Sequence, residues 1–153
     1  MMMRRDVFER YSKSGDNLIS ILHDLKNQNE WNYLSKEDLQ AAADYLDLPY
    51  SFVHGVATFY TMLSLKPRGR HIIRVCQSPP CQLMGATTVS DELKKLLNVE
   101  FGQTSADQMF TLEMTSCLGV CGVAPAMMVD EDVFGNLTPQ RVNEIIGEIR
   151  RES

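Results

Sequence analysis

The chain has 153 residues, of which 44% are hydrophobic and 23% charged, so it suits one globular domain or a small domain with a helical extension. Its net charge of −5 argues against nucleic acid and against an anionic membrane surface as partners. No apolar run approaches the ~18 residues of a membrane span, and the N-terminus lacks the apolar core of a signal peptide. We therefore expect a cytoplasmic protein without direct membrane insertion, in a compartment where structural disulfides are rare.

The first part of the chain is predicted to be helical. Residues 17–28 carry apolar side chains at the i, i+3, i+4 and i+7 spacing of one helix face: Leu18, Ile21, Leu22 and Leu25. In residues 34–49, Ser35 is expected to cap a second helix, with Asp38 completing a capping-box-like start. Pro49 is expected to end that helix and open another.

A third helix is predicted within residues 50–65. Its apolar stripe is expected to contain Phe52, Val56, Phe59, Tyr60 and Leu63. Gly55 lies inside this segment, where the missing side chain would let another backbone approach. Three short helices with tight connections predict a small bundle, which we assign to residues 1–66.

The periodicity changes after residues 66–70, KPRGR, which have the composition of a linker. The β-branched residues of 71–76 predict a strand that ends at Cys76. A helix over 84–97, a strand over 109–116 and two strand-like runs within 126–137 follow. The last helix is expected to start with Thr138 as its N-cap and Pro139 as its first residue. This order predicts a small α/β layer over residues 71–153.

The cysteines are the most informative residues in the chain. They form a C-x4-C pair and a C-x3-C pair with 35 residues between the pairs: Cys76, Cys81, Cys117 and Cys121. Each pair is expected in a loop that follows a strand, so neighbouring strands would bring four sulfurs to one edge of the sheet. Four thiolates suit Zn²⁺ or an iron–sulfur cluster.

The spacing favours the cluster, because zinc sites are usually built from tighter C-x2-C pairs. Gly119 and Gly122 also leave room for backbone N–H groups to face sulfur, and such contacts tune a cluster's potential. Three alternatives remain open: four unrelated buried cysteines, a structural zinc ion and a thiol–disulfide enzyme. No glycine-rich phosphate loop and no nucleophile–base pair stands out, so we expect neither a nucleotide site nor a catalytic residue.

Four segments together resemble a known family in the same order along the chain. They are GVATFYTM (55–62), VCQSPPCQLMGA (75–86), FTLEMTSCLGVCGVAPAMMVD (110–130) and FGNLTPQRV (134–142). The chain resembles the NuoE-type family, the small thioredoxin-like [2Fe–2S] ferredoxin subunit of complex I and of NAD-linked hydrogenases and formate dehydrogenases. The resemblance covers about residues 15 to 150, and the cysteine pattern is its most specific part.

The resemblance implies one [2Fe–2S] cluster, with four ligands: Cys76, Cys81, Cys117 and Cys121. It implies a helical docking region, residues 1–66, followed by a thioredoxin-like [2Fe–2S] ferredoxin domain, residues 71–153. The chain would be an electron-transfer subunit with no substrate site of its own, next to a flavoprotein subunit that binds FMN and NAD(H) and a further iron–sulfur catalytic subunit. The parent enzyme would be a soluble NAD-linked or bifurcating hydrogenase, a formate dehydrogenase, or complex I at the cytoplasmic face of the membrane. A free-standing ferredoxin shuttle and a zinc-stabilised adaptor are the alternatives.

Overall fold

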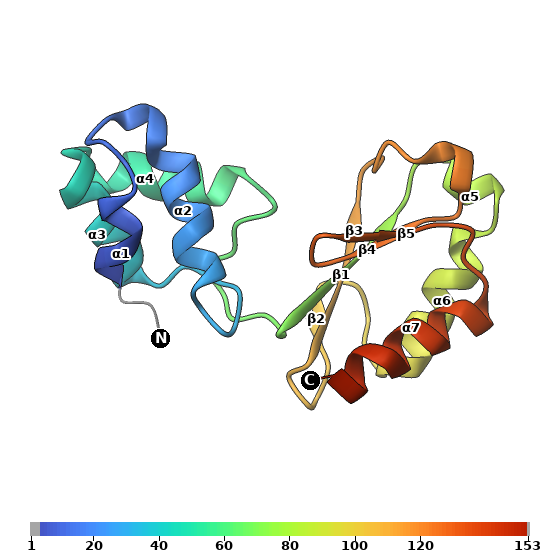
Figure 1. The fold of residues 1–153 in the computed structure, drawn as a ribbon. Helices are drawn as coiled ribbons and strands as arrows, with labels where there is room; N and C mark the ends of the chain where they lie inside the picture. Colours follow the sequence, from blue (N-terminus) through green and yellow to red (C-terminus); the bar gives the residue numbers. More distant parts are fainter. Residues whose placement is uncertain (1–3, 153) are drawn as a thin grey trace. The chain divides into compact units, whose positions relative to one another are not determined.

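The computed structural model describes residues 4–152, and the chain divides into two compact units (Figure 1). The first unit comprises residues 1–68 and the second residues 69–153, so the boundary falls within the KPRGR segment. The first unit contains helices and the second a five-stranded sheet with helices. The predicted fold class, a helical bundle followed by an α/β layer, is confirmed. None of the helices in the described part of the chain combines the length and apolar character of a membrane-spanning segment.

The N-terminal unit contains more helical turns than the three that periodicity predicts. Its elements are α1 (Arg4–Glu9), the 3-10 turn η1 (Gly15–Asn17), α2 (Leu18–Asn27), α3 (Lys36–Leu46) and α4 (Tyr50–Phe59). The six-residue α1 is too short to carry an apolar stripe, yet it places Val7 fully in the core. The predicted stripes of α2 and α3 are buried in that same core.

The start of α3 is as predicted, but its end is not. Asp38 N–H donates to Ser35 Oγ at 3.1 Å, and Ser35 N–H donates to the Asp38 carboxylate at 2.9 Å, which forms a capping box. The helix ends at Leu46, because Asp47 adopts a left-handed conformation with φ of 54°. Pro49 therefore does not end α3; it is the N-cap of α4.

The predicted apolar stripe over residues 50–65 is only partly confirmed: Leu63 is buried in the core and Val56 packs against it. The buried residues of α4 are Val53 and Ala57, whereas Phe52 is 55% exposed and Phe59 is 77% exposed. The helix segment is apolar on two faces, and the side chains that are small enough for close packing lie on the buried one. A Cβ on Gly55 would meet nothing within 4 Å, so the expected close approach of another backbone does not occur in the described chain.

The C-terminal unit is built on a mixed sheet with strand order β2-β3-β1-β4-β5. Its elements are β1 (His71–Cys76), α5 (Pro79–Leu83), α6 (Ala86–Leu97), β2 (Gln103–Thr104), β3 (Phe110–Thr115), η2 (Cys121–Val123), β4 (Met127–Val129), β5 (Asp132–Phe134) and α7 (Pro139–Glu152). The helices α6 and α7 lie side by side and share one apolar core with the sheet (Figure 1). The predicted strands and helices are present, and α5 and β2 are additional.

The central strand β1 sets the position of the cysteines. It pairs in parallel with β3, where Cys76 lies opposite Thr115, and antiparallel with β4. Parallel neighbours end at the same edge of a sheet. The segments that leave β1 and β3 therefore begin side by side, and each carries two cysteines.

Candidate metal centre

The structure places all four predicted ligands in the C-terminal unit as free thiols. Cys76 is the last residue of β1, and Cys81 lies in α5. Cys117 follows the end of β3 by two residues, and Cys121 opens η2. The first pair is buried, with each residue 1% exposed, whereas the second pair is exposed. One pair of sulfurs is thus shielded by protein and the other faces solvent.

Cys81 lies in a short helix, whereas we expected a loop. Pro79 and Pro80 fill the first two positions of α5. Proline is well suited there, because the N–H groups of those positions have no partner within a helix. The two prolines therefore start a helical turn, and this turn carries Cys81 to the sulfur of Cys76.

The buried pair is surrounded by hydrogen-bond donors. Ser78 Oγ lies 3.1 Å from Cys76 Sγ, and the Leu118 backbone also hydrogen-bonds to that sulfur. Burial raises the pKa of Cys76, but hydrogen bonds from Ser78, Leu118 and Cys81 outweigh burial and bring the pKa down to about 7. Burial raises the pKa of Cys81, and its neighbour Cys76 raises it further. The pKa values of the two thiols are thus shifted in opposite directions, downward for Cys76 and upward for Cys81.

In the exposed pair, too, the pKa of one thiol is lowered and that of the other is raised. Cys117 Sγ and Cys121 Sγ are 3.6 Å apart, and Gly119 N–H donates to Cys117 Sγ at 3.3 Å. That backbone hydrogen bond lowers the pKa of Cys117, whereas the hydrogen bond with Cys117 raises the pKa of Cys121. Gly119 has a φ of 80°, a conformation that favours glycine, and its N–H faces sulfur as expected. For Gly122, the expected hydrogen bond from the backbone N–H to a sulfur is not found within residues 4–152.

The two segments meet each other at the sulfurs. Leu118, between the cysteines of the second pair, is close enough for its backbone to lower the pKa of Cys76, and Ser78, between those of the first, likewise acts to lower the pKa of Cys117. In the described part of the chain, no three cysteine, histidine or acidic side chains surround a point where one metal ion could be held. The donor set instead consists of two adjoining thiol pairs. Two pairs fit a [2Fe–2S] cluster, which is held by four cysteine thiolates.

Ser78 is a site residue that the sequence interpretation missed. It stands at the N-cap of α5, where a serine normally caps the helix. No side-chain capping bond is formed there, and its hydroxyl lies against Cys76 Sγ instead. The sequence offered one signal, Pro80, which removes one of the two N–H groups that usually donate to a capping serine.

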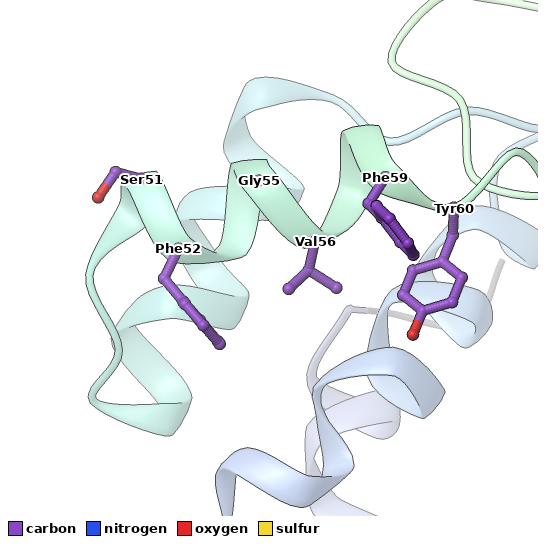
Figure 2. A pocket seen from close by; sticks show the side chains of 6 residues that line it. All are labelled: Ser51, Phe52, Gly55, Val56, Phe59 and Tyr60. Atoms are coloured by element: carbon purple, nitrogen blue, oxygen red, sulfur yellow. The ribbon is translucent and has the colours of Figure 1, made fainter.

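A second feature is an apolar groove on α4 in the N-terminal unit, with a volume of about 440 Å³. Figure 2 shows Phe52, Val56, Phe59 and Tyr60 extending to the same side of this segment. The rings of Phe59 and Tyr60 meet edge to face with centroids 5.0 Å apart. Large apolar side chains that gather on one exposed face are typical of a protein–protein interface.

Comparison with known proteins identifies the family of this chain. A family described as thioredoxin-like [2Fe–2S] ferredoxin matches residues 5–150. The HndA subunit of the NADP-reducing hydrogenase of Solidesulfovibrio fructosivorans is 37% identical over 131 residues, which cover 86% of this chain and 75% of the relative. A subunit of the NADH-quinone oxidoreductase of Escherichia coli K12 is 42% identical over 119 residues, which cover 78% of this chain and 72% of the relative.

A solved structure has the same fold. The crystal structure of an NAD⁺-reducing [NiFe]-hydrogenase in the H₂-reduced state matches 93% of this chain with a TM-score of 0.80 at 20% identity. The match covers 23% of the hydrogenase chain, so this protein spans about a quarter of that chain's length. Since the family match extends over nearly the whole chain and two relatives exceed 30% identity, the protein belongs to the thioredoxin-like [2Fe–2S] ferredoxin family, and its cofactor is one [2Fe–2S] cluster.

Proposed function

We propose that this protein is an electron-transfer subunit of a multisubunit NAD(P)H-linked oxidoreductase. Its four cluster ligands are Cys76, Cys81, Cys117 and Cys121. The observation that carries the proposal is that these four thiols, in two pairs, leave parallel neighbouring strands at one edge of the sheet. The similarity to subunits of an NADP-reducing hydrogenase and an NADH-quinone oxidoreductase supports the assignment to this class of enzyme.

When bound, the cluster supplies one-electron redox chemistry, and all-cysteine [2Fe–2S] centres of the plant type lie near about −400 mV. The chain provides the setting for that chemistry. Cys76 and Cys81 hold their side of the site away from water. The backbone N–H of Gly119 and the contacts of Leu118 and Ser78 direct hydrogen bonds at sulfur, which stabilise negative charge there.

Electrons enter and leave, in this proposal, on the side of Cys117 and Cys121, because these two ligands are exposed and a redox partner can approach them. The large apolar side chains that are exposed in the same unit include Leu83, Met84 and Met114. Leu83 and Met84 follow Cys81 closely, and Met114 precedes Cys117 by three residues. They provide a small apolar contact beside the cluster loops.

The partner in this proposal is a flavoprotein subunit that binds FMN and NAD(H), and a further iron–sulfur catalytic subunit completes the enzyme. The N-terminal unit is the main docking region, since its α4 groove exposes Phe52, Phe59 and Tyr60. No substrate site is assigned to this chain. The hydride chemistry belongs to the flavin of the partner, and the chain accepts or donates single electrons.

The test is to purify the protein without oxygen, alone and together with its flavoprotein partner. Iron and acid-labile sulfide should each approach two per chain, and NADH should produce the EPR signal of the reduced cluster only when the flavoprotein is present. Stoichiometric zinc in place of iron would refute the cluster assignment. Reduction by NADH at the same rate without the flavoprotein would refute the role of an electron-transfer subunit.

A further inference from the structure

The hydroxyl group of Ser78 lies within reach of sulfurs from both cysteine pairs. Its Oγ is 3.1 Å from Cys76 Sγ, and its proximity also acts to lower the pKa of Cys81 and of Cys117. The side chain is half-buried, at the point where the chain leaves β1 and enters α5. The hydroxyl is thus hydrogen-bonded to one ligand sulfur, that of Cys76.

The local sequence explains why this hydroxyl is directed at sulfur. A serine at the N-cap usually accepts a hydrogen bond from the N–H of the second or third helical residue. In α5 the second helical residue is Pro80, which has no N–H, so only the N–H of Cys81 could form such a bond. The hydroxyl makes no capping bond to the helix. It is left available for the sulfurs.

Ligation fixes the direction of this hydrogen bond. In the free thiol form, either the hydroxyl or the thiol can donate. A thiolate bound to iron carries no proton and can only accept, so Ser78 must then be the donor. A donor at a ligand sulfur stabilises the additional negative charge that arrives with an electron.

We propose that Ser78 is a positioning residue that raises the reduction potential of the centre by donating a hydrogen bond to the ligand sulfur of Cys76. This inference rests on the proposed ligation by Cys76. Reduction adds one electron, supplied by the redox partner, and neither breaks nor forms a bond at Ser78. Cys76 is 1% exposed and its buried neighbours include Ala86, Ala124 and Ala126, so water has little access to replace the donor.

The experiment compares Ser78→Ala with Ser116→Ala in the full-length protein loaded with its cluster. Ser116 is a matched control, because it is exposed and adjacent to the ligand Cys117, but its hydroxyl makes no hydrogen bond to a sulfur of the described chain. Titration under EPR detection should show that Ser78→Ala lowers the equilibrium constant for reduction about tenfold, which equals about 59 mV for a one-electron couple. Ser116→Ala should stay within about twofold of the wild type.

Two further variants keep the inference testable if Ser78→Ala fails to load iron. Ser78→Thr and Ser78→Val have nearly the same shape and differ by the hydroxyl group. ENDOR spectra in D₂O should show an exchangeable deuteron near the cluster in Ser78→Thr that is missing in Ser78→Val, and the potential should be higher in Ser78→Thr. Equal potentials and equal deuteron couplings in the two variants would overturn the inference.

The outcomes separate this inference from the proposed function. A wild-type protein without iron and sulfide would overturn the ligation by cysteine and the role of Ser78 together. A wild-type protein with an intact cluster whose potential does not change in Ser78→Ala would overturn the role of Ser78 alone.

Discussion

Replacing Phe59 by alanine should weaken docking to the flavoprotein partner without destabilising the chain itself. Phe59 lies at the end of α4, is 77% exposed and lines the apolar groove. An aromatic side chain buries roughly 150–250 Å² when covered, so about 150 Å² of Phe59 remains available to a partner. At about 25 cal/mol per Å², this area corresponds to an upper limit of about 4 kcal/mol.

Part of this binding free energy is offset by the entropy lost when the side chain and its surroundings become ordered on association. We therefore expect a loss of about 2 kcal/mol, which is about a 30-fold increase in Kd. The free energy of unfolding of the isolated protein should change by less than about 0.5 kcal/mol, because exposed positions contribute little to stability.

Isothermal titration calorimetry with the purified flavoprotein partner measures the first quantity, and urea denaturation measures the second. Ile19→Ala is the control, since Ile19 is an exposed apolar residue on α2 that does not line the groove. The reasoning is refuted if Phe59→Ala and Ile19→Ala both bind with wild-type affinity. A large loss of folding stability in Phe59→Ala would also contradict it, because the ring would then belong to the core.

Three other predictions concern the two units and the thiols. Deleting residues 1–68 should leave a domain that binds the cluster, since all four cysteines and a separate core lie in 69–153. The same deletion should abolish co-purification with the flavoprotein. If the shortened protein still assembled at full strength, the docking surface would lie on the ferredoxin domain. Cys121→Ala should abolish or severely weaken the EPR signal of the reduced cluster, and an unchanged signal would remove this residue from the ligand set. Because the pKa values of Cys81 and Cys121 are raised, both thiols hold protons that loading must release, so cluster loading should weaken as the pH falls from about 8 to about 6. Proton uptake, or no pH change, during loading in weak buffer would contradict this sign.

Periodicity predicted the helices whose polar and apolar faces are distinct. The stripes of α2 and α3 are buried, and the capping box at Ser35 marked the start of α3 to the residue. Periodicity was wrong for Phe52, Phe59 and Tyr60, because the α4 segment is apolar on two faces and the spacing alone cannot show which face contacts the core. The short elements α1 and β2, with six and two residues, are below the length at which a repeat can be recognised.

The candidate site was predictable where chemistry restricts the residue type. Four cysteines in two close pairs indicated metal ligation, and the β-branched run before Cys76 indicated that a strand positions the first pair. Ser78 was not recognised, because a serine before a helix is expected to cap it, whereas this hydroxyl lies against Cys76 Sγ. Hydrogen bonds of this kind arise from the three-dimensional course of the loop and leave no regular spacing in the sequence.

The unequal exposure of the two cysteine pairs has a consequence for how the protein is made. Before iron arrives, Cys117 Sγ and Cys121 Sγ are only 3.6 Å apart at the surface, and Gly119 N–H favours the thiolate of Cys117. A thiolate beside an accessible thiol is the reactive state for oxidation to a disulfide. If this pair binds the cluster as proposed, we expect it to be the point at which oxidation by oxygen competes with iron delivery. In the newly synthesised chain, cluster assembly would then compete with disulfide formation between Cys117 and Cys121. The thiols of Cys76 and Cys81 are buried and therefore less accessible to oxidants.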